Sequence, residues 1–170
     1  HCIPIDPFYL TWKAREFGLH TRFIELAGEM NDSMLSYTVS RVSEALNHHR
    51  KPLMGSRILI VGLAYTPEVD DMRESPSLHL MDRLHALGAE VSYHDPYIPV
   101  VPETREHAHW AGSKSADWTP QSLSSFDAVL IATNHRSVDY ALLLDNAHCI
   151  IDCRNAMKEF DAQPGQIWKA

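Results

Sequence analysis

The sequence predicts an α/β protein in which a long helix precedes an open, doubly wound parallel sheet. From Gly55 onward, short apolar runs alternate with amphipathic stretches of helical period. Strands that alternate with helices form βαβ units with right-handed crossovers. The first run, RILIVGLAY, is continuous and rich in β-branched residues, as expected of a strand buried on both faces of a sheet. Upstream of it, apolar residues recur at three- and four-residue steps with no interrupting proline, which predicts the long helix.

Two helices are expected before the sheet. The first is DPFYLTWKAREFG, with Asp6 as its expected N-cap, Pro7 at its first position and Gly18 as its stop. The second covers residues 21–49 and ends before Pro52. A helix of this length spans two bodies or pairs with a copy of itself, so we expect a homodimer through it.

The remaining elements follow in the order that a doubly wound sheet requires. A helix capped by Ser75 or Ser77 connects the first two strands, and residues 97–118 are expected to be mostly loop. The expected elements after the first strand are a helix over 75–88, a strand over 89–96, a strand over 125–135, a helix over 138–146 and a strand over 148–155.

Composition narrows the class of protein. The chain has 170 residues, of which 45% are hydrophobic, and 22 acids against 15 bases give a formal net charge of -7. This balance argues against a nucleic-acid partner, which requires concentrated Lys and Arg. The stretch ILIVGLAY is too short to cross a bilayer, so no membrane partner is expected. Three cysteines fit a reducing compartment, and we expect a cytoplasmic protein in which Cys149 and Cys153 are inert buried thiols.

A ligand is expected at the carboxyl ends of the strands, where strand order reverses. The segments that leave the four strands would bring together Arg73, Asp95, His135 and Arg154, beside a helix that starts after Ser75. Backbone N–H groups at a helix start, with guanidinium groups nearby, suit a diphosphate. The turn after the first strand lacks the G-x-G-x-x-G pattern, so the sequence contains no evidence of a complete NAD site.

Several motifs in order resemble the UDP-glucose/GDP-mannose dehydrogenase family. They are HCIPIDPFYL, the long helix containing MNDSM, VGLAYTPEVDDMRESPS, DAVLIATNH and IDCRN. HCIPIDP resembles the branch that oxidises UDP-N-acetylglucosamine or UDP-N-acetylmannosamine. The resemblance implies a catalytic-cysteine loop and short helix over 1–20, a dimerisation helix over 21–52 and a Rossmann-like UDP-sugar-binding domain over 53–170. It also implies that an NAD-binding domain precedes His1 and that His1 is a break in a longer chain.

The resemblance further implies the oxidation of the sugar C6 alcohol to a carboxylate, with NAD as cofactor. Cys2 matches the nucleophile that forms a thiohemiacetal and then a thioester, and Asp6 matches the aspartate that assists proton transfer. Arg154 matches the arginine that reaches toward the cofactor. The implied substrate-binding residues are Tyr65, Thr66, Arg73 and Ser75. Thr66 replaces the lysine that the family usually carries, and a threonine supplies a hydrogen bond but no charge.

Other interpretations remain open from the residues alone. The chain could be a non-catalytic nucleotide-binding or dimerisation module, either free-standing or derived from an inactive relative. Asp6 could act only as a helix cap, and Arg73 could be a salt-bridged loop residue behind the acids of 68–71. The histidines at 48–49 and 107–109 lack partners at known zinc spacings, so we expect them to be solvated and expect no metal site.

Overall fold

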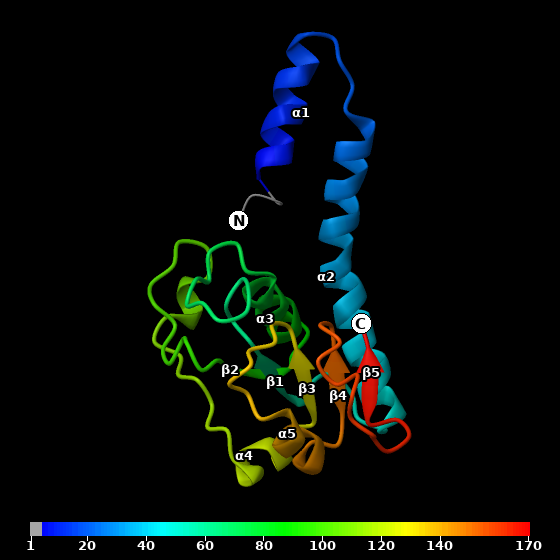
Figure 1. The fold of residues 1–170 in the computed structure, drawn as a ribbon, viewed down its shortest axis with the longest axis vertical. Helices are drawn as coiled ribbons and strands as arrows, with labels where there is room; N and C mark the ends of the chain where they lie inside the picture. Colours follow the sequence, from blue (N-terminus) through cyan, green and yellow to red (C-terminus); the bar gives the residue numbers. More distant parts are fainter. Residues whose placement is uncertain (1–4) are drawn as a thin grey trace.

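The computed structural model describes residues 5–170 and places a five-stranded parallel sheet beneath a long helix (Figure 1). The strand order is β2-β1-β3-β4-β5, and every neighbouring pair is parallel. Among the described residues, no helix is both long and apolar enough to cross a membrane. The elements are α1 (Asp6–Glu16), α2 (Arg22–His48), β1 (Arg57–Val61), α3 (Pro76–Ala86), β2 (Glu90–His94), η1 (Ala108–Trp110), α4 (Pro120–Ser124), β3 (Ala128–Ile131), α5 (Tyr140–Asn146), β4 (Ile150–Asp152) and β5 (Ile167–Lys169).

Helices cover both faces of the sheet, which confirms the predicted doubly wound α/β architecture. Alternate residues of β1 enter different cores because successive side chains of a strand point to opposite faces. Ile58 and Ile60 pack with α2 and α3, whereas Leu59 and Val61 pack with α4 and α5. All four side chains are fully buried. The continuous apolar run in the sequence is therefore explained by burial on both sides.

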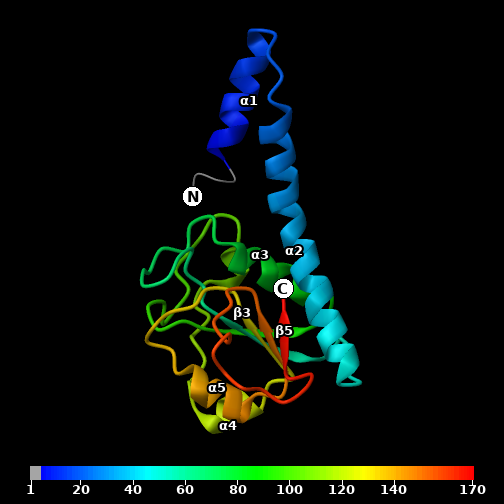
Figure 2. The same ribbon diagram turned by 45° about the vertical axis from the view of Figure 1, so that its right-hand side comes forward.

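The two halves of α2 have different surroundings. The second half packs on the sheet through Thr38, Val42, Ala45 and Leu46, all of which are buried. The first half runs beside α1 and projects away from the sheet (Figure 2). We call residues 6–37, which comprise α1 and the first half of α2, the helical arm.

A small residue allows the two helices of the arm to approach. The ring of Phe8 lies against Gly28, where an added Cβ would be only 2.4 Å from the ring atom Cζ. The hydroxyl of Thr21 donates to that of Thr11 at 2.9 Å, which ties the start of α2 to α1. The carboxyl ends of β3, β4 and β5 face the start of α1 in Figure 1.

Two predictions for the start of α1 were wrong. Pro7 stands at the second position of the helix and not at the first. Asp6 is not the N-cap of α1, since Ile5 occupies that position, and within residues 5–170 no side chain caps the helix. Asp6 lies in the first turn, where its negative charge interacts favourably with the helix dipole. The structure also adds the edge strand β5, which the sequence analysis did not predict. Ser75 is confirmed as the N-cap of α3, because its hydroxyl accepts a hydrogen bond from the N–H of Ser77.

Candidate functional site

The strand order reverses between β1 and β3, and the backbone approaches itself closely there. Gly62 follows β1 with φ +85°, and a Cβ at this position would lie 2.1 Å from the carbonyl oxygen of Thr133. Only glycine combines this positive φ with so close an approach. The hydroxyls of Ser77 and Thr133 donate to the carbonyls of Gly62 and Ala64, each at 2.8 Å. Contacts within the chain therefore fill the turn between β1 and β3 and leave no space for a ligand against its backbone.

Asp95, at the end of β2, organises this edge of the sheet. Its side chain is 1% exposed. One carboxylate oxygen accepts hydrogen bonds from the N–H groups of Leu63 and Ala64, at 2.7 and 3.0 Å. The other accepts from the N–H groups of Tyr97 and Ile98. A single carboxylate thus holds the loops that follow β1 and β2 in one arrangement.

His135, after β3, completes the same network. It is fully buried, and its Nε2 lies 3.1 Å from a carboxylate oxygen of Asp95. The N–H of Glu68 donates to Nδ1 at 3.0 Å, so Nδ1 is an acceptor and Nε2 carries the proton. The side chain of Glu68 then accepts from the N–H of Arg136 at 2.7 Å. The imidazole consequently links the ends of three adjacent strands.

The network also explains the protonation state of Asp95. Burial by itself would raise the pKa of this carboxyl group. Hydrogen bonds from His135 and from the N–H groups of Ala64 and Tyr97 outweigh that effect and lower the pKa below its ordinary value. Asp95 is therefore a structural anion at neutral pH.

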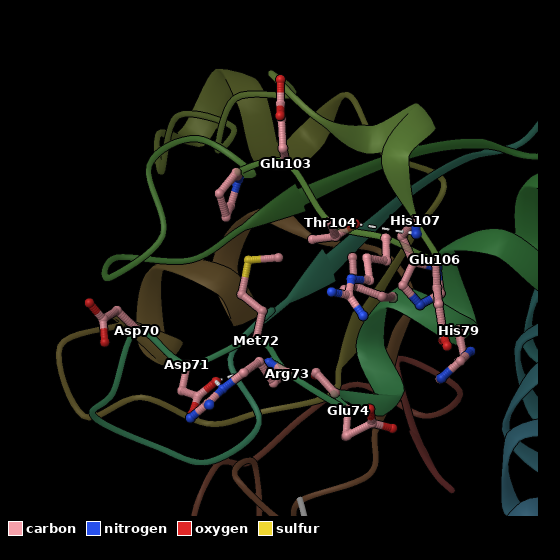
Figure 3. Close-up of a pocket in the computed structure, with 14 residues that line it drawn as sticks. Asp70, Asp71, Met72, Arg73, Glu74, His79, Glu103, Thr104, Glu106 and His107 are labelled. Carbon is pink, nitrogen blue, oxygen red and sulfur yellow. Dashed lines mark hydrogen bonds and ion pairs between the residues drawn. The ribbon is translucent and has the colours of Figure 1, made fainter.

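A pocket of about 790 Å³ opens between the start of α3 and the loop after β2. It is lined by residues 70–75, 78–79 and 102–107. Arg73, labelled in Figure 3, and Ser75 both line it, so the structure brings these two predicted residues together. The guanidinium of Arg73 is engaged by Asp71, with Nε and an outer nitrogen at 3.0 and 2.8 Å from its two oxygens. An anionic ligand of Arg73 would have to replace this exposed ion pair.

A second pocket, of about 390 Å³, lies above β4 and contains Arg154 together with Asn134, Asn155 and Lys169. The buried carboxylate of Asp152 lines this pocket. It accepts hydrogen bonds from the N–H groups of Arg154, Ala156 and Met157 at 2.9–3.1 Å and so fixes the loop after β4. Arg154 is exposed, and among the described residues no ion pair engages its guanidinium. The predicted cofactor residue therefore lies apart from Arg73 and Ser75.

The other predicted residues occupy different places. Tyr65 and Thr66 follow β1 but line neither pocket; Tyr65 is half-buried and Thr66 is exposed. Asp6 is exposed on α1. Cys2 lies outside the described residues. Cys149 and Cys153 are free thiols; Cys149 is buried as expected, whereas Cys153 is only half-buried. Burial raises their pKa values to about 12 and about 11.

A polar cluster beside the larger pocket was not predicted from the sequence. His107 is only 8% exposed, so the expectation that both histidines of 107–109 are solvated was wrong for this residue. Its Nδ1 and the Nε2 of His109 contact the carboxylate of Asp82 on α3, at 2.6 and 2.7 Å. His79, on the same helix, lies against His107 with ring centroids 4.8 Å apart. The only signal in the sequence was the number of histidines, because their partners lie far away along the chain.

The turn after β1 does not fit the pyrophosphate of NAD. Such a turn must present free N–H groups and small residues to the ligand. Here the N–H groups of Leu63 and Ala64 are already directed at Asp95, and both residues are fully buried. The carboxylate of Asp95 takes the place that a negatively charged pyrophosphate would occupy at these N–H groups.

Comparison with known proteins identifies relatives of this fold. The sequence profile of the UDP-glucose/GDP-mannose dehydrogenase family, UDP binding domain, matches residues 59–159. Protein CapL of Staphylococcus aureus is 27% identical over an alignment of 175 positions, which covers 99% of this chain and 40% of CapL. The UDP-N-acetyl-D-mannosamine dehydrogenase of Pyrococcus horikoshii is 30% identical over 165 residues, covering 94% of this chain and 35% of that protein.

Solved structures share the architecture. The UDP-D-ManNAc dehydrogenase of Pyrococcus horikoshii superimposes with a TM-score of 0.79 at 27% identity, over 99% of this chain and 37% of that one. A UDP-glucose dehydrogenase from Pyrobaculum islandicum gives 0.77 at 24% identity, over 99% and 36%, and supports the fold alone. The present chain thus spans well under half the length of the relatives that it matches.

Proposed function

Because the chain belongs to the UDP-glucose/GDP-mannose dehydrogenase family, we propose that it is the C-terminal portion of a longer UDP-N-acetylhexosamine 6-dehydrogenase. The observation that carries this proposal is the match over nearly the whole chain to a relative named for UDP-N-acetyl-D-mannosamine. The motif HCIPIDP points to the same branch. The reaction would convert the C6 alcohol of the sugar to a carboxylate and supply uronic acid precursors for polysaccharides.

Within that enzyme, the described residues would form the UDP-binding lobe. Ser75 caps α3 at the rim of the larger pocket, so the positive end of the helix dipole points there and would attract an anion, against the repulsion of the five carboxylates that also line the pocket. Arg73 would contribute to binding by breaking its ion pair with Asp71 and pairing with a phosphate of the ligand. Thr66 stands on the loop after β1 without the charge that the family usually has there. Replacing it by lysine should therefore strengthen binding of the UDP-sugar.

The chemical step would depend on the first residues of the chain. We assign Cys2 as the nucleophile and Asp6 as its acid–base partner from the motif HCIPIDP. NAD would be held by a part of the protein outside this chain, since the turn after β1 does not suit it. Arg154, exposed in the smaller pocket, would face that cofactor side.

The arm offers a surface for a homodimer. Its two helices leave large apolar side chains in contact with solvent, and exposed patches of this kind mark association surfaces. A second copy of the chain is the partner that we propose. The exposed apolar residues of the arm include Tyr9, Leu10, Trp12, Phe17, Leu19, Phe23, Leu26, Met30, Met34 and Tyr37.

Activity of the full-length protein tests the proposal. The formation of NADH should be followed with UDP-N-acetylglucosamine, UDP-N-acetylmannosamine and UDP-glucose. We expect oxidation of a UDP-N-acetylhexosamine, loss of that activity in Cys2→Ser and retention in the control Cys149→Ala, whose side chain is buried and lines neither pocket. Oxidation of UDP-glucose alone would contradict the substrate assignment, and full activity of Cys2→Ser would contradict the nucleophile. UDP binding without any oxidation would favour the non-catalytic module.

A further inference from the structure

Three metal-ligating side chains meet at one wall of the larger pocket. They are His79 on α3 and the neighbouring pair Glu106 and His107 on the loop after β2. One ligand atom from each lies within 4.8 Å of the other two. All three line the pocket, so a dissolved ion can reach them (Figure 3).

A second observation separates this cluster from a chance group of histidines. His107 is nearly buried, and the carboxylate of Asp82 accepts a hydrogen bond from its Nδ1–H at 2.6 Å. This hydrogen bond fixes the tautomer and leaves the lone pair of Nε2 available to a ligand. A histidine whose far nitrogen donates to a carboxylate is the usual arrangement of histidines that bind metals.

Asp82 is itself held firmly in place. Trp110 donates its Nε1–H to the carboxylate at 2.7 Å, and Nε2 of His109 lies 2.7 Å from the same oxygen. Asp82 stands one helical turn after His79 on α3. The supporting carboxylate and one of the metal ligands are therefore presented by the same rigid element, which keeps the site organised in the absence of an ion.

We propose that His79, Glu106 and His107 bind a divalent cation of the zinc class. Two imidazoles and one carboxylate are a ligand set that zinc accepts, with a fourth position open to water or a ligand. Ligand atoms on a tetrahedral zinc ion lie about 3.4 Å apart, so the cluster must contract slightly on binding. Glu106 is exposed and His79 half-exposed, so both can move toward the fixed His107.

The ion would join the loop over 102–107 to α3. Both segments line the pocket that also contains Arg73 and Ser75. Binding would stabilise the folded state and restrict the loop, because the ion binds only when both segments are in place. This inference rests on the cluster alone and is independent of the proposed dehydrogenase activity.

Titration with zinc tests the site. The purified protein should be freed of metal with a chelator and titrated calorimetrically with zinc chloride, and the experiment repeated with cobalt chloride while the visible spectrum is recorded. We expect one ion per chain, a cobalt spectrum typical of tetrahedral nitrogen and oxygen ligands, and a higher melting temperature with zinc. His79→Gln and Glu106→Gln should each weaken binding by at least about tenfold.

The variants are chosen so that folding does not obscure the result. His79 and Glu106 are accessible, so their glutamine variants should fold, and circular dichroism checks this. His148→Gln is the matched control, because His148 is exposed and remote from the cluster along the chain. Absence of zinc binding in the wild type would overturn the proposal. So would binding that His79→Gln and Glu106→Gln leave unchanged, since the ion would then be held elsewhere.

Discussion

The sheet edge and the helical arm differ in how far their side chains are buried and paired within the chain. At the edge, the buried groups Asp95 and His135 are both hydrogen-bonded within the chain, and Gly62 packs directly against backbone. In the arm, Phe23 is 89% exposed and Thr11 is the one buried residue of α1. The polar groups of the edge therefore find their partners within the chain, whereas the arm presents large apolar side chains to solvent. The comparison separates residues that stabilise the fold from residues available for association.

The largest effect should come from Gly62→Ala at the sheet edge. The new methyl group would collide with the carbonyl of Thr133, and the backbone cannot relax because its neighbours are fully buried. We expect a loss of more than about 3 kcal/mol in the free energy of unfolding, measured by urea denaturation.

Gly55→Ala is the matched control for this change. Gly55 has a similar φ of +79°, but an added Cβ would meet no atom within 4 Å. It should lose only about 1 kcal/mol, the cost of the left-handed conformation. Equal losses in the two variants would show that the close approach at Gly62 does not matter.

Asp95→Asn should have the next largest effect. An amide nitrogen would face N–H donors, so at least one buried donor would lose its acceptor, which costs about 2 kcal/mol at neutral pH. The pKa of Asp95 is lowered in the folded protein, so its contribution is complete above the ordinary value of 3.8 and is lost as the pH falls below it.

The pH profile distinguishes this role from simple loss of packing. The wild type should lose stability more steeply than Asp95→Asn as the pH falls below 3.8. The exposed residue Asp161 provides the control, and Asp161→Asn should follow the wild-type profile. Parallel profiles for wild type and Asp95→Asn would contradict the assignment of Asp95 as a buried anion.

The smallest effect on folding should come from Phe23→Ala in the arm. Because this side chain is almost fully exposed, the free energy of unfolding of the monomer should change by less than about 0.5 kcal/mol. Self-association, measured by sedimentation at several concentrations, should nevertheless weaken. Leu84→Ala, at a fully buried position of α3, should show the reverse pattern with a loss of about 3 kcal/mol. Unchanged association in Phe23→Ala would remove this residue from the proposed dimer surface.

Elements with a strong hydrophobic period were predictable, and elements defined by distant contacts were not. The helix α2 and the four strands β1 to β4 followed from apolar patterns. The strand β5 has only three residues, is partly exposed and follows Pro164-Gly165, so it has no such pattern. It exists because it pairs with β4, which local sequence does not encode.

The candidate site shows the same division. The carboxyl ends of parallel strands meet at one edge, so Asp95 and His135 could be placed together from the sequence. Their hydrogen bond, and the separation of Arg73 from Arg154 into two pockets, depend on loop conformations that no local pattern specifies. Likewise, Asp82 contacts His107 across a long connection, so the polar cluster was visible only in three dimensions.

The inward-facing carboxylate of Asp95 limits how this domain could be redesigned to bind a dinucleotide. The carboxylate occupies the N–H groups of the turn after β1, which in dinucleotide-binding sheets contact the pyrophosphate. A dinucleotide therefore cannot bind at this turn. Opening it would require exchanging that acid for a small neutral residue while also freeing the amides it now occupies. Without both changes, mutations to glycine in the neighbouring turn would create flexibility and no new specificity.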